Sequence, residues 1–470
     1  MSLDVSFSVT ARYRATRALW QIALVVVCLM FRLSPLAGQQ NSGDAAGGTD
    51  ESIGSAAEDY SGPAVLSLGN QPALTGVQAD TIQPFLTVNR IYGTGLGSGL
   101  SGGDPNAVQS GVELGFGLRG THRWKRVTMQ VEYNGNYRDY NGQSAANGLN
   151  QLAIATVVAQ LKRHLVLSFR QTGGILRQDI GGLLLQPAAL ETSTTLPTNE
   201  PFSNGLKIID SIVTLTYQKT RRLSFRGTIE GSLLRQSTPD VGTNSSILSA
   251  DMDYRLSGRS TIGLDYSFRH FGYTTFGWAD VQGIALDYTW RATKSIDVAF
   301  QVGMNHSSAV ALAVVPIDPE LAAILGTSTG IQVSDRAINS PLVNVRVTKR
   351  WHRVDADLDY RRGISAGNGL VLTSTEDSMI AGLHYSNPNR WTVSVEAGRT
   401  AMEEIAGTGT YTGNTFGASF NRFIRPGVQA VARFDVRPVS YTGSQGLNRT
   451  YYLGEIGFIF SPSEIPIALR

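Results

Sequence analysis

Cysteine is almost absent from this chain, since Cys28 is the only one among 470 residues. A single thiol cannot form an internal disulfide, so the fold must be held together by other means. Charge is also sparse: Asp, Glu, Lys and Arg make up 16% of the residues, and lysine contributes little of the positive charge. The 42% hydrophobic content and the 51 glycines without a strict repeat exclude a fully disordered chain and a collagen-like chain.

Long hydrophobic runs are equally scarce. The clearest one, Ala18–Phe31, follows a basic segment at 12–17 and precedes small residues that end at Gly38. A run of about 14 residues is short for a membrane-spanning helix but typical of a secretory signal peptide. We therefore predict a signal peptide over residues 1–38, and the alternative is a membrane anchor in which Arg32 reaches the interface.

Cleavage near Gly38 would remove the one cysteine and lower the formal net charge from +3 to zero. Nucleic-acid binding needs a basic surface, so we predict no nucleic-acid partner. Residues 39–80 are rich in Gly, Ala, Ser, Asp and Glu and show no apolar period, which predicts a disordered linker. The remaining region, 81–470, has one uniform character and is predicted to form a single domain.

That region repeats one pattern, in which apolar and polar residues alternate, a short basic turn follows, and a second alternating segment returns. The first case alternates over 112–118, turns at 121–125 and alternates again over 127–133. Further turns of this kind lie at 162–164, 219–222, 257–259, 291–294, 349–352, 387–390 and 425–427. A period of two indicates strands, whereas helices would repeat every 3.6 residues. These hairpins, with single segments at 82–89 and 450–460, predict about 18 strands (16–18).

The connections between the hairpins are longer than the turns within them, and the longest are 173–206, 305–338 and 363–376. Short turns and long loops that alternate along a meander lie at opposite ends of it. An even number of strands then leaves both chain ends on the side of the short turns.

Two architectures could use such strands: a soluble sandwich or propeller, and a membrane β-barrel. The polar face carries charges in mid-strand, as at Asp251 and Asp355, which a dry core would not tolerate unpaired. Aromatic residues gather in the apolar phase next to the short turns, as an interfacial girdle requires. They are Tyr217, Tyr254, Tyr288, Trp290, Trp351, Tyr385 and Trp391. We predict an all-β fold, a transmembrane antiparallel up-and-down β-barrel.

The hairpins Met252–Tyr266 and Leu286–Val298, each with a tyrosine before an arginine-bearing turn, resemble bacterial outer-membrane β-barrels of the porin type. The resemblance covers most of 81–460 as a pattern. It implies contact with outer-membrane lipid and with the outer-membrane assembly machinery, and the short-turn side would place both termini in the periplasm. Some relatives of this type are thought to accompany exopolysaccharide export. The chain departs from the family pattern after Phe460, because such barrels commonly end on an aromatic residue.

Motifs for chemistry are nearly absent. The glycines of 97–102 match a dinucleotide-binding pattern, but no strand-to-helix context surrounds them. Rim residues such as His270, Asp280 and Ser307 could in principle form a hydrolase site, but no nucleophile motif supports one. We predict no enzyme activity, no cofactor and no metal site.

The charges on the predicted inner face carry the functional hypothesis. An 18-strand barrel is wide enough for a water-filled channel unless loops fill it. The predicted pore-lining set is Glu132, Arg138, Asp253, Arg255, Asp265, Arg269, Asp287, Arg346, Asp357, Asp359, Arg361, Arg433 and Asp435. Such charges would screen solutes, or would merely neutralise each other between neighbouring strands. We predict a porin-like channel for passive diffusion of small hydrophilic solutes. The alternative is a non-conducting structural barrel or a partner in exopolysaccharide export.

The connection 305–338 is the candidate constriction, because it holds an apolar run over Ala309–Ile317. Asp318 is placed as an N-cap, Glu320 near the positive end of a short helix, and Gly326 as its stop. We expect this loop to fold inward, with Asp318 and Glu320 near the aqueous path. The alternative is that it packs over the barrel rim or against loop 173–206.

Overall fold

The structure is a computed structural model, and all residues that it describes belong to the second of two compact units, Tyr60–Arg470. The described ranges are 81–94, 108–141, 147–176, 206–236, 242–274, 277–318, 329–367, 373–387, 390–407, 409–442, 447–462 and 465–466, with Glu320, Ile324, Gly326, Ser328 and Val371 between them. The predicted signal peptide (1–38), the predicted linker (39–80) and the glycine pattern at 97–102 lie outside the described residues.

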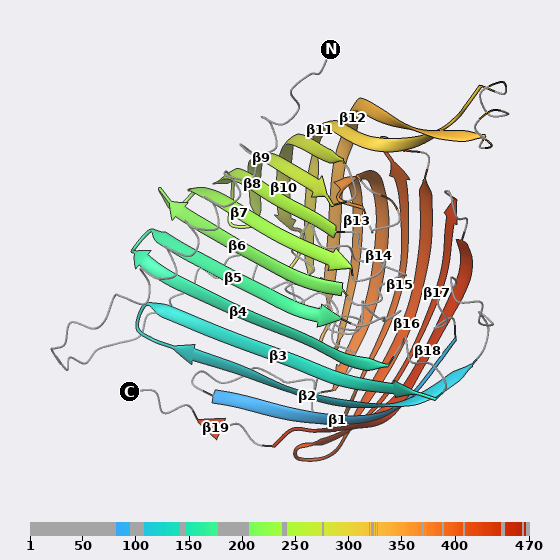
Figure 1. Cartoon of the computed structure of the whole chain (residues 1–470). Coiled ribbons are helices and arrows are strands. Elements are labelled where there is room, and N and C mark those ends of the chain that lie inside the picture. The colour runs from blue at the N-terminus through green and yellow to red at the C-terminus, as the bar shows by residue number, and fades with distance from the viewer. Residues whose placement is uncertain are drawn as a thin grey trace, which may run out of the picture. The chain divides into compact units, whose positions relative to one another are not determined.

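One antiparallel sheet contains every strand that the structure describes, and it closes on itself (Figure 1). Its strands are β1 (Thr81–Thr94), β2 (Gln109–Arg123), β3 (Val127–Tyr140), β4 (Gly148–Lys162), β5 (Leu165–Leu176), β6 (Leu206–Gln218), β7 (Leu223–Gln236), β8 (Gly242–Arg255), β9 (Ser260–Tyr273), β10 (Trp278–Arg291), β11 (Ile296–Pro316), β12 (Thr329–Arg350), β13 (Val354–Ser365), β14 (Ser374–Asn387), β15 (Trp391–Glu404), β16 (Thr410–Arg425), β17 (Val428–Thr442), β18 (Leu447–Phe460) and β19 (Ile465–Pro466). Each long strand pairs with its neighbours in sequence, and β1 pairs with β18 to close the barrel. The prediction of an up-and-down barrel of about 18 strands is confirmed, and β19 adds two residues beside the start of β1.

The alternation of apolar and polar residues along each strand determines which side chains face outward. In β2, Leu114 and Phe116 are exposed, whereas Glu113 beside them is fully buried. Because successive side chains of a strand point to opposite faces, the apolar residues form the outer surface and the polar ones face the lumen. This is the reverse of a soluble barrel, and it places the charged groups inside.

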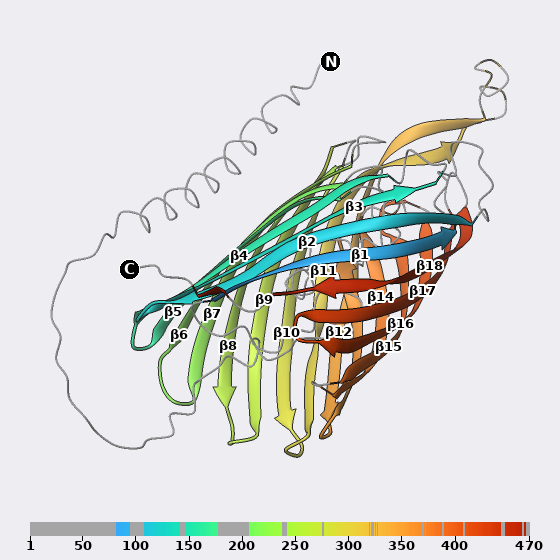
Figure 2. The same ribbon diagram turned by 90° about the horizontal axis from the view of Figure 1, so that it is seen from below.

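The two ends of the barrel differ in their connections. At the end that we call the turn end, hairpins are closed by two to four residues, as at Pro426–Gly427 between β16 and β17. Gly427 has a φ of +76°, which suits the second central residue of a type II turn after proline. The start of β1 and the end of β18 also lie at the turn end, since Leu86 pairs with Phe460. Figure 2 shows these turns opposite the end that carries the longer connections, the loop end.

The predicted alternation of short turns with long loops is only partly correct. The connections β7–β8 and β9–β10 at the loop end span only a few residues. The largest difference is in 305–338, most of which is strand: β11 and β12 pair continuously out to Pro316 and Thr329. The apolar run that begins at Ala309 is predicted as loop, but it is strand up to Pro316, because each of its residues pairs with β12.

The cap prediction at the tip of this hairpin is confirmed. The backbone N–H of Glu320 donates to Asp318 Oδ1 at 2.9 Å, and Glu320 and Ile324 are helical. Gly326 has a φ of +68°, the conformation that ends a helix. No helix within the described ranges is both long enough and apolar enough to cross a membrane.

Candidate functional site

The outer surface of the barrel is an apolar belt. Large apolar side chains are exposed on it around the whole circumference, among them Leu86, Phe116, Leu248, Leu286, Phe416 and Ile456. A continuous exposed apolar surface of this size would aggregate in water, whereas acyl chains solvate it. A closed sheet leaves no unpaired edge, which is what a span through lipid requires.

Aromatic residues form the predicted girdle at the turn end. Tyr217, Tyr254, Tyr288, Trp290, Trp351 and Trp391 are all exposed on the outer face. Tyr385 stacks on Trp391, with ring centroids 4.5 Å apart. Amphipathic rings of this kind prefer the boundary between acyl chains and headgroups. The belt and girdle place the barrel in a membrane.

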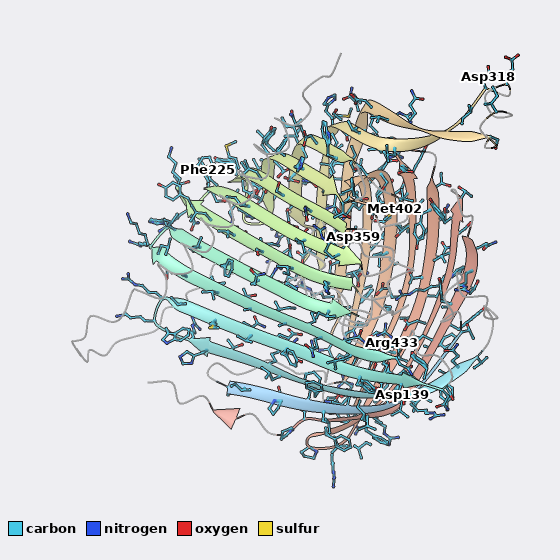
Figure 3. All side chains as sticks on the ribbon, in the orientation of Figure 1. Asp139, Phe225, Asp318, Asp359, Met402 and Arg433 are labelled. Carbon is cyan, nitrogen blue, oxygen red and sulfur yellow. The ribbon has the colours of Figure 1, made fainter. Side chains whose placement is uncertain are left out.

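All thirteen predicted pore-lining residues lie on the inner face, but they do not form one open surface. Several alternate with outward apolar neighbours, as Asp253 does with Met252 and Tyr254. Figure 3 labels Asp359, on β13, and Arg433, on β17. The environment of each charge therefore depends on which wall carries it.

One wall, formed by β1 to β4, holds its charges in buried pairs. Arg138 forms a short ion pair with Glu113, and that carboxylate also accepts from Asn89 at 3.1 Å and Asn136 at 3.0 Å. The Arg138 side chain is only 3% exposed. Arg138 belongs to the predicted pore lining and Glu113 does not, because only the strand register brings the four residues together.

Three more predicted pore-lining residues are paired: Glu132 with Arg119, in a part-buried pair, and Arg433 with Asp435, in a buried one. Arg119 lies 3.0 Å from Glu132, and Arg433 Nε donates to Asp435 Oδ2 at 2.7 Å. Neutralisation between neighbouring strands, one of the two expectations for the inward charges, describes Glu132, whereas Arg433 and Asp435 pair within β17. Burial removes Arg433 and Asp435 from an aqueous path in this structure.

The wall formed by β7 to β10 is different, because its carboxylates outnumber their partners. Asp251 and Asp265 are directly opposed on β8 and β9, and Gly263 lies between Asp253 and Asp287. A Cβ atom at Gly263 would lie 2.6 Å from Asp253 Oδ1, so the glycine makes room for the carboxylates. We call Asp251, Asp253, Asp265 and Asp287 the acidic strip.

Within the acidic strip, Asp253 pairs with Arg226 at 3.6 Å, and both side chains are partly exposed. The other three aspartates make no ion pair with any residue that the structure describes. Further round the lumen, Arg346 Nε donates to Asp359 Oδ2 at 2.9 Å. The strip is thus a half-buried cluster of carboxylates in the lumen wall with more acidic than basic groups, which attracts cations.

Residues of two loop-end connections, β13–β14 and β15–β16, are buried in apolar clusters inside the barrel. Val371, between β13 and β14, is fully buried in a cluster with Ile91, Met402 and Tyr411. Ile364 and Ala366, close to it in the chain, belong instead to a second apolar cluster on β9 to β11. Ala366 and Val371 of the β13–β14 connection therefore belong to different apolar clusters.

Hydrogen bonds from lumen side chains hold these connections in place. Arg269 Nη1 donates to the carbonyl of Ile364 at 3.1 Å, and the Tyr273 hydroxyl donates to the carbonyl of Ala366 at 3.0 Å. Arg336 Nη1 donates to the carbonyl of Ile405, between β15 and β16, at 3.1 Å. Arg269 was predicted as a pore-lining charge, and here it holds the carbonyl of Ile364 near the end of β13.

The predicted constriction residues lie elsewhere. Asp318 and Glu320 are exposed at the tip of the β11–β12 hairpin, which projects beyond the barrel (Figure 3). The expectation of an inward fold is wrong, because the continuous β11–β12 ladder carries the tip away from the lumen. Val371, between β13 and β14, is instead buried inside the barrel, and a single buried valine is a signal too weak to be found in the sequence.

The rim residues considered for a hydrolase are not brought together. His270 Nδ1 lies 2.6 Å from Asp280 Oδ1 on the outer face, whereas Ser307 is fully buried on the inner face of β11. Within the described part of the chain, no group of three or more His, Cys, Asp or Glu side chains is placed to hold a metal ion.

A closed antiparallel barrel with an apolar outer belt and a charged lumen defines an outer-membrane β-barrel protein. Among solved structures, the chain is similar to OccAB3 of Acinetobacter baumannii, at 10% identity and a TM-score of 0.42, over 82% of this chain and 99% of that one. It is also similar to OccK5 (OpdH) of Pseudomonas aeruginosa, at 12% identity and a TM-score of 0.40, with the same coverage of both chains.

A BenF-like porin from Pseudomonas fluorescens Pf-5 is similar at 10% identity and a TM-score of 0.40, again over 82% of this chain and 99% of that chain. These structural neighbours are outer-membrane porins. At such identities the likeness concerns the fold alone. No protein-family model matches the sequence, and no curated protein matches it either.

Proposed function

We propose that the protein is an outer-membrane channel for passive diffusion of small hydrophilic solutes. The observation that supports this is the acidic strip. Three of its carboxylates make no ion pair among the described residues, and charges without partners are tolerated where water reaches them. An 18-strand barrel is also wide enough to hold water beside the connections that narrow it.

In this proposal the turn end faces the periplasm, since short periplasmic turns and longer outer loops are the rule for such barrels. Both ends of the barrel-forming segment would then be periplasmic. The outer belt would contact outer-membrane lipid, and insertion would depend on the outer-membrane assembly machinery. The channel would need no cofactor and would catalyse no reaction.

The test is the electrical behaviour of the purified full-length protein in planar bilayers. We expect discrete conductance steps from protein whose migration on a gel is heat-modifiable, the mark of a folded barrel. A folded barrel that inserts and never conducts would refute the channel.

The apolar clusters at the loop end support a second candidate, a non-conducting barrel that serves as a structural protein or as an export partner. Val371 and Ile364 join the inward connection to two different walls, and each is at most 3% exposed. In that case the barrel would stay silent in bilayers and would copurify with a polysaccharide-export complex, and removal of residues 39–80 would abolish the association.

A further inference from the structure

Three polar side chains lie in one row across β8, β9 and β10 on the outer face of the barrel. His270 of β9 is directly opposed to Ser246 of β8 on one side and to Asp280 of β10 on the other. Leu248, two residues from Ser246 along β8, is exposed on the outer face, so Ser246 shares its outward phase. All three polar residues are partly exposed. The row therefore presents a hydroxyl, an imidazole and a carboxylate, with the imidazole in the middle.

The imidazole is held in the tautomer that a general base needs. His270 Nδ1 lies 2.6 Å from Asp280 Oδ1. An ionised carboxylate only accepts hydrogen bonds, so the neutral ring carries its proton on Nδ1 and has a lone pair on Nε2. A Cβ atom on Gly272 would lie 3.8 Å from Nε2, an ordinary contact distance, so this nitrogen borders the space that the glycine leaves open.

Ser246 supplies a nucleophile on the other side of the imidazole. Directly opposed residues have Cβ atoms about 4.5–5.5 Å apart, so side-chain rotation brings the Ser246 hydroxyl within reach of His270 Nε2. No hydrogen bond joins the two among the described contacts, as is common before a substrate binds. Asn244, exposed on β8 and directly opposed to Gly272, adds an amide donor beside the same space. These groups have the roles of a serine hydrolase triad.

The row lies at the edge of the apolar belt that is nearer the loop end. Asp280 is eight positions along β10 from Tyr288 of the aromatic girdle. At about 3.4 Å per residue and a strand tilt of about 40°, this is about 21 Å along the membrane normal, against an apolar band about 25 Å tall. Leu248 and Phe268 lie one outward position toward the turn end, and Trp278 lies one beyond the row. The row is therefore at the boundary between acyl chains and headgroups, where lipid esters lie.

We propose that Ser246, His270 and Asp280 hydrolyse an acyl ester of a membrane lipid, in the leaflet at the loop end. The acyl chain lies along Leu248 and Phe268, which brings the ester to the hydroxyl. This activity belongs to the outer face and is separate from the channel, whose lumen takes no part in it. The prediction of no enzyme activity rests on the lack of a nucleophile motif, and a triad from three separate strands has none.

The reaction follows from where each proton goes. The Ser246 oxygen attacks the ester carbonyl and His270 Nε2 takes the serine proton, while Asp280, a positioning residue, stabilises the imidazolium. The Asn244 amide donates to the oxyanion. The bond to the alcohol oxygen breaks, that oxygen takes the proton from His270, and the acyl group stays on Ser246. Water then gives a proton to His270 and attacks the acyl group, which leaves as the fatty acid while the proton returns to Ser246.

Release of fatty acid from vesicles tests the proposal. The purified full-length protein is placed in phosphatidylethanolamine vesicles with radiolabelled acyl chains, and in vesicles where lipopolysaccharide carries the label instead, so the source of the ester is distinguished. We expect labelled fatty acid from at least one of these lipids. Ser246→Ala should abolish the release, and His270→Asn should lower its rate at least about a hundredfold. A native barrel that migrates as folded and releases nothing from either lipid, or a Ser246→Ala variant that releases as much, would overturn the proposal.

The matched controls are His306→Asn and Ser308→Ala. His306 Nδ1 also contacts a residue of the next strand, Asn339 Oδ1 at 2.8 Å, and both replaced side chains lie in the outward phase of β11. Each control should keep the native rate. Hydrolysis that needs either of them and not His270 would contradict the proposal. Asp280→Asn removes the charge and keeps the shape, so the rate should fall, and Asp280→Glu should restore part of it. An unchanged rate in Asp280→Asn would remove the aspartate from the triad.

Covalent labelling identifies the nucleophile independently. In a hexadecyl fluorophosphonate, an activated serine oxygen attacks phosphorus, fluoride leaves, and the serine proton passes to the base. Mass spectrometry should find the adduct on Ser246 in the native protein and at least about a hundredfold more slowly in His270→Asn. Labelling of another serine, or equal labelling of Ser246 in both proteins, would overturn the proposal. Single-channel conductance of Ser246→Ala should equal that of the native protein, so failure of the hydrolase is distinguished from failure of the channel.

Discussion

Replacement of Asp251, Asp265 and Asp287 by asparagine would remove the three carboxylates of the acidic strip that make no ion pair. The change preserves side-chain size and leaves the Arg226–Asp253 pair in place. Because these aspartates face the lumen from adjacent strands, the change should alter the ion selectivity of the channel and spare its fold.

The size of the effect follows from Coulomb's law. A monovalent cation that passes about 7 Å from one carboxylate in water gains about 0.6 kcal/mol, which is a factor of about three in its local concentration. Three such carboxylates would give a factor of about twenty at most, and less where the cation is farther from one of them. Since the Debye length shortens from about 10 Å at 0.1 M salt to about 3 Å at 1 M, the effect should vanish at high salt.

The assay is the reversal potential across a planar bilayer with a KCl gradient. We expect the native channel to prefer K⁺ over Cl⁻ in dilute salt, and the triple variant to lose most of that preference. Arg433→Gln with Asp435→Asn is the matched control, because it removes a buried pair of zero net charge and should leave the selectivity unchanged. An unaltered permeability ratio in a folded, conducting triple variant would show that the acidic strip does not line the path of the ions.

Three other changes probe the remaining features. Removal of residues 319–325 at the hairpin tip should leave single-channel conductance unchanged, and an increase would mean that the tip reaches the lumen after all. Val371→Asp places a charge in an apolar cluster and should release the β13–β14 connection, so conductance should rise; an unchanged conductance would locate the constriction elsewhere. Glu113→Ala leaves the Arg138 guanidinium without its carboxylate and should cost about 3–5 kcal/mol of stability, seen as a lower temperature of heat modification. Glu113→Gln should cost less, and equal losses in both variants would argue against a charge effect.

The sequence by itself determined the features that depend on one strand at a time. Alternation within β2 predicts that Leu114 faces lipid and that its neighbours face inward, because the geometry of a strand sends successive side chains to opposite faces. The same local pattern, interrupted by basic turns, was enough to predict the number of strands, the closed architecture and the aromatic girdle at the turn end.

Only the tertiary structure decided which inward residues face water in the lumen and which pair with one another. Glu113 and Asn89 are distant in sequence from Arg138, and their contact depends on the register of β1, β2 and β3. The same holds for Asp251 and Asp265 on β8 and β9, which meet without an arginine between them. Which connection lies inside the barrel depends on how several segments, distant in sequence, pack in the same enclosed volume. Val371 is buried inside the barrel because residues of β1, β15 and β16 pack around it. The longer β11–β12 hairpin continues its own ladder outward.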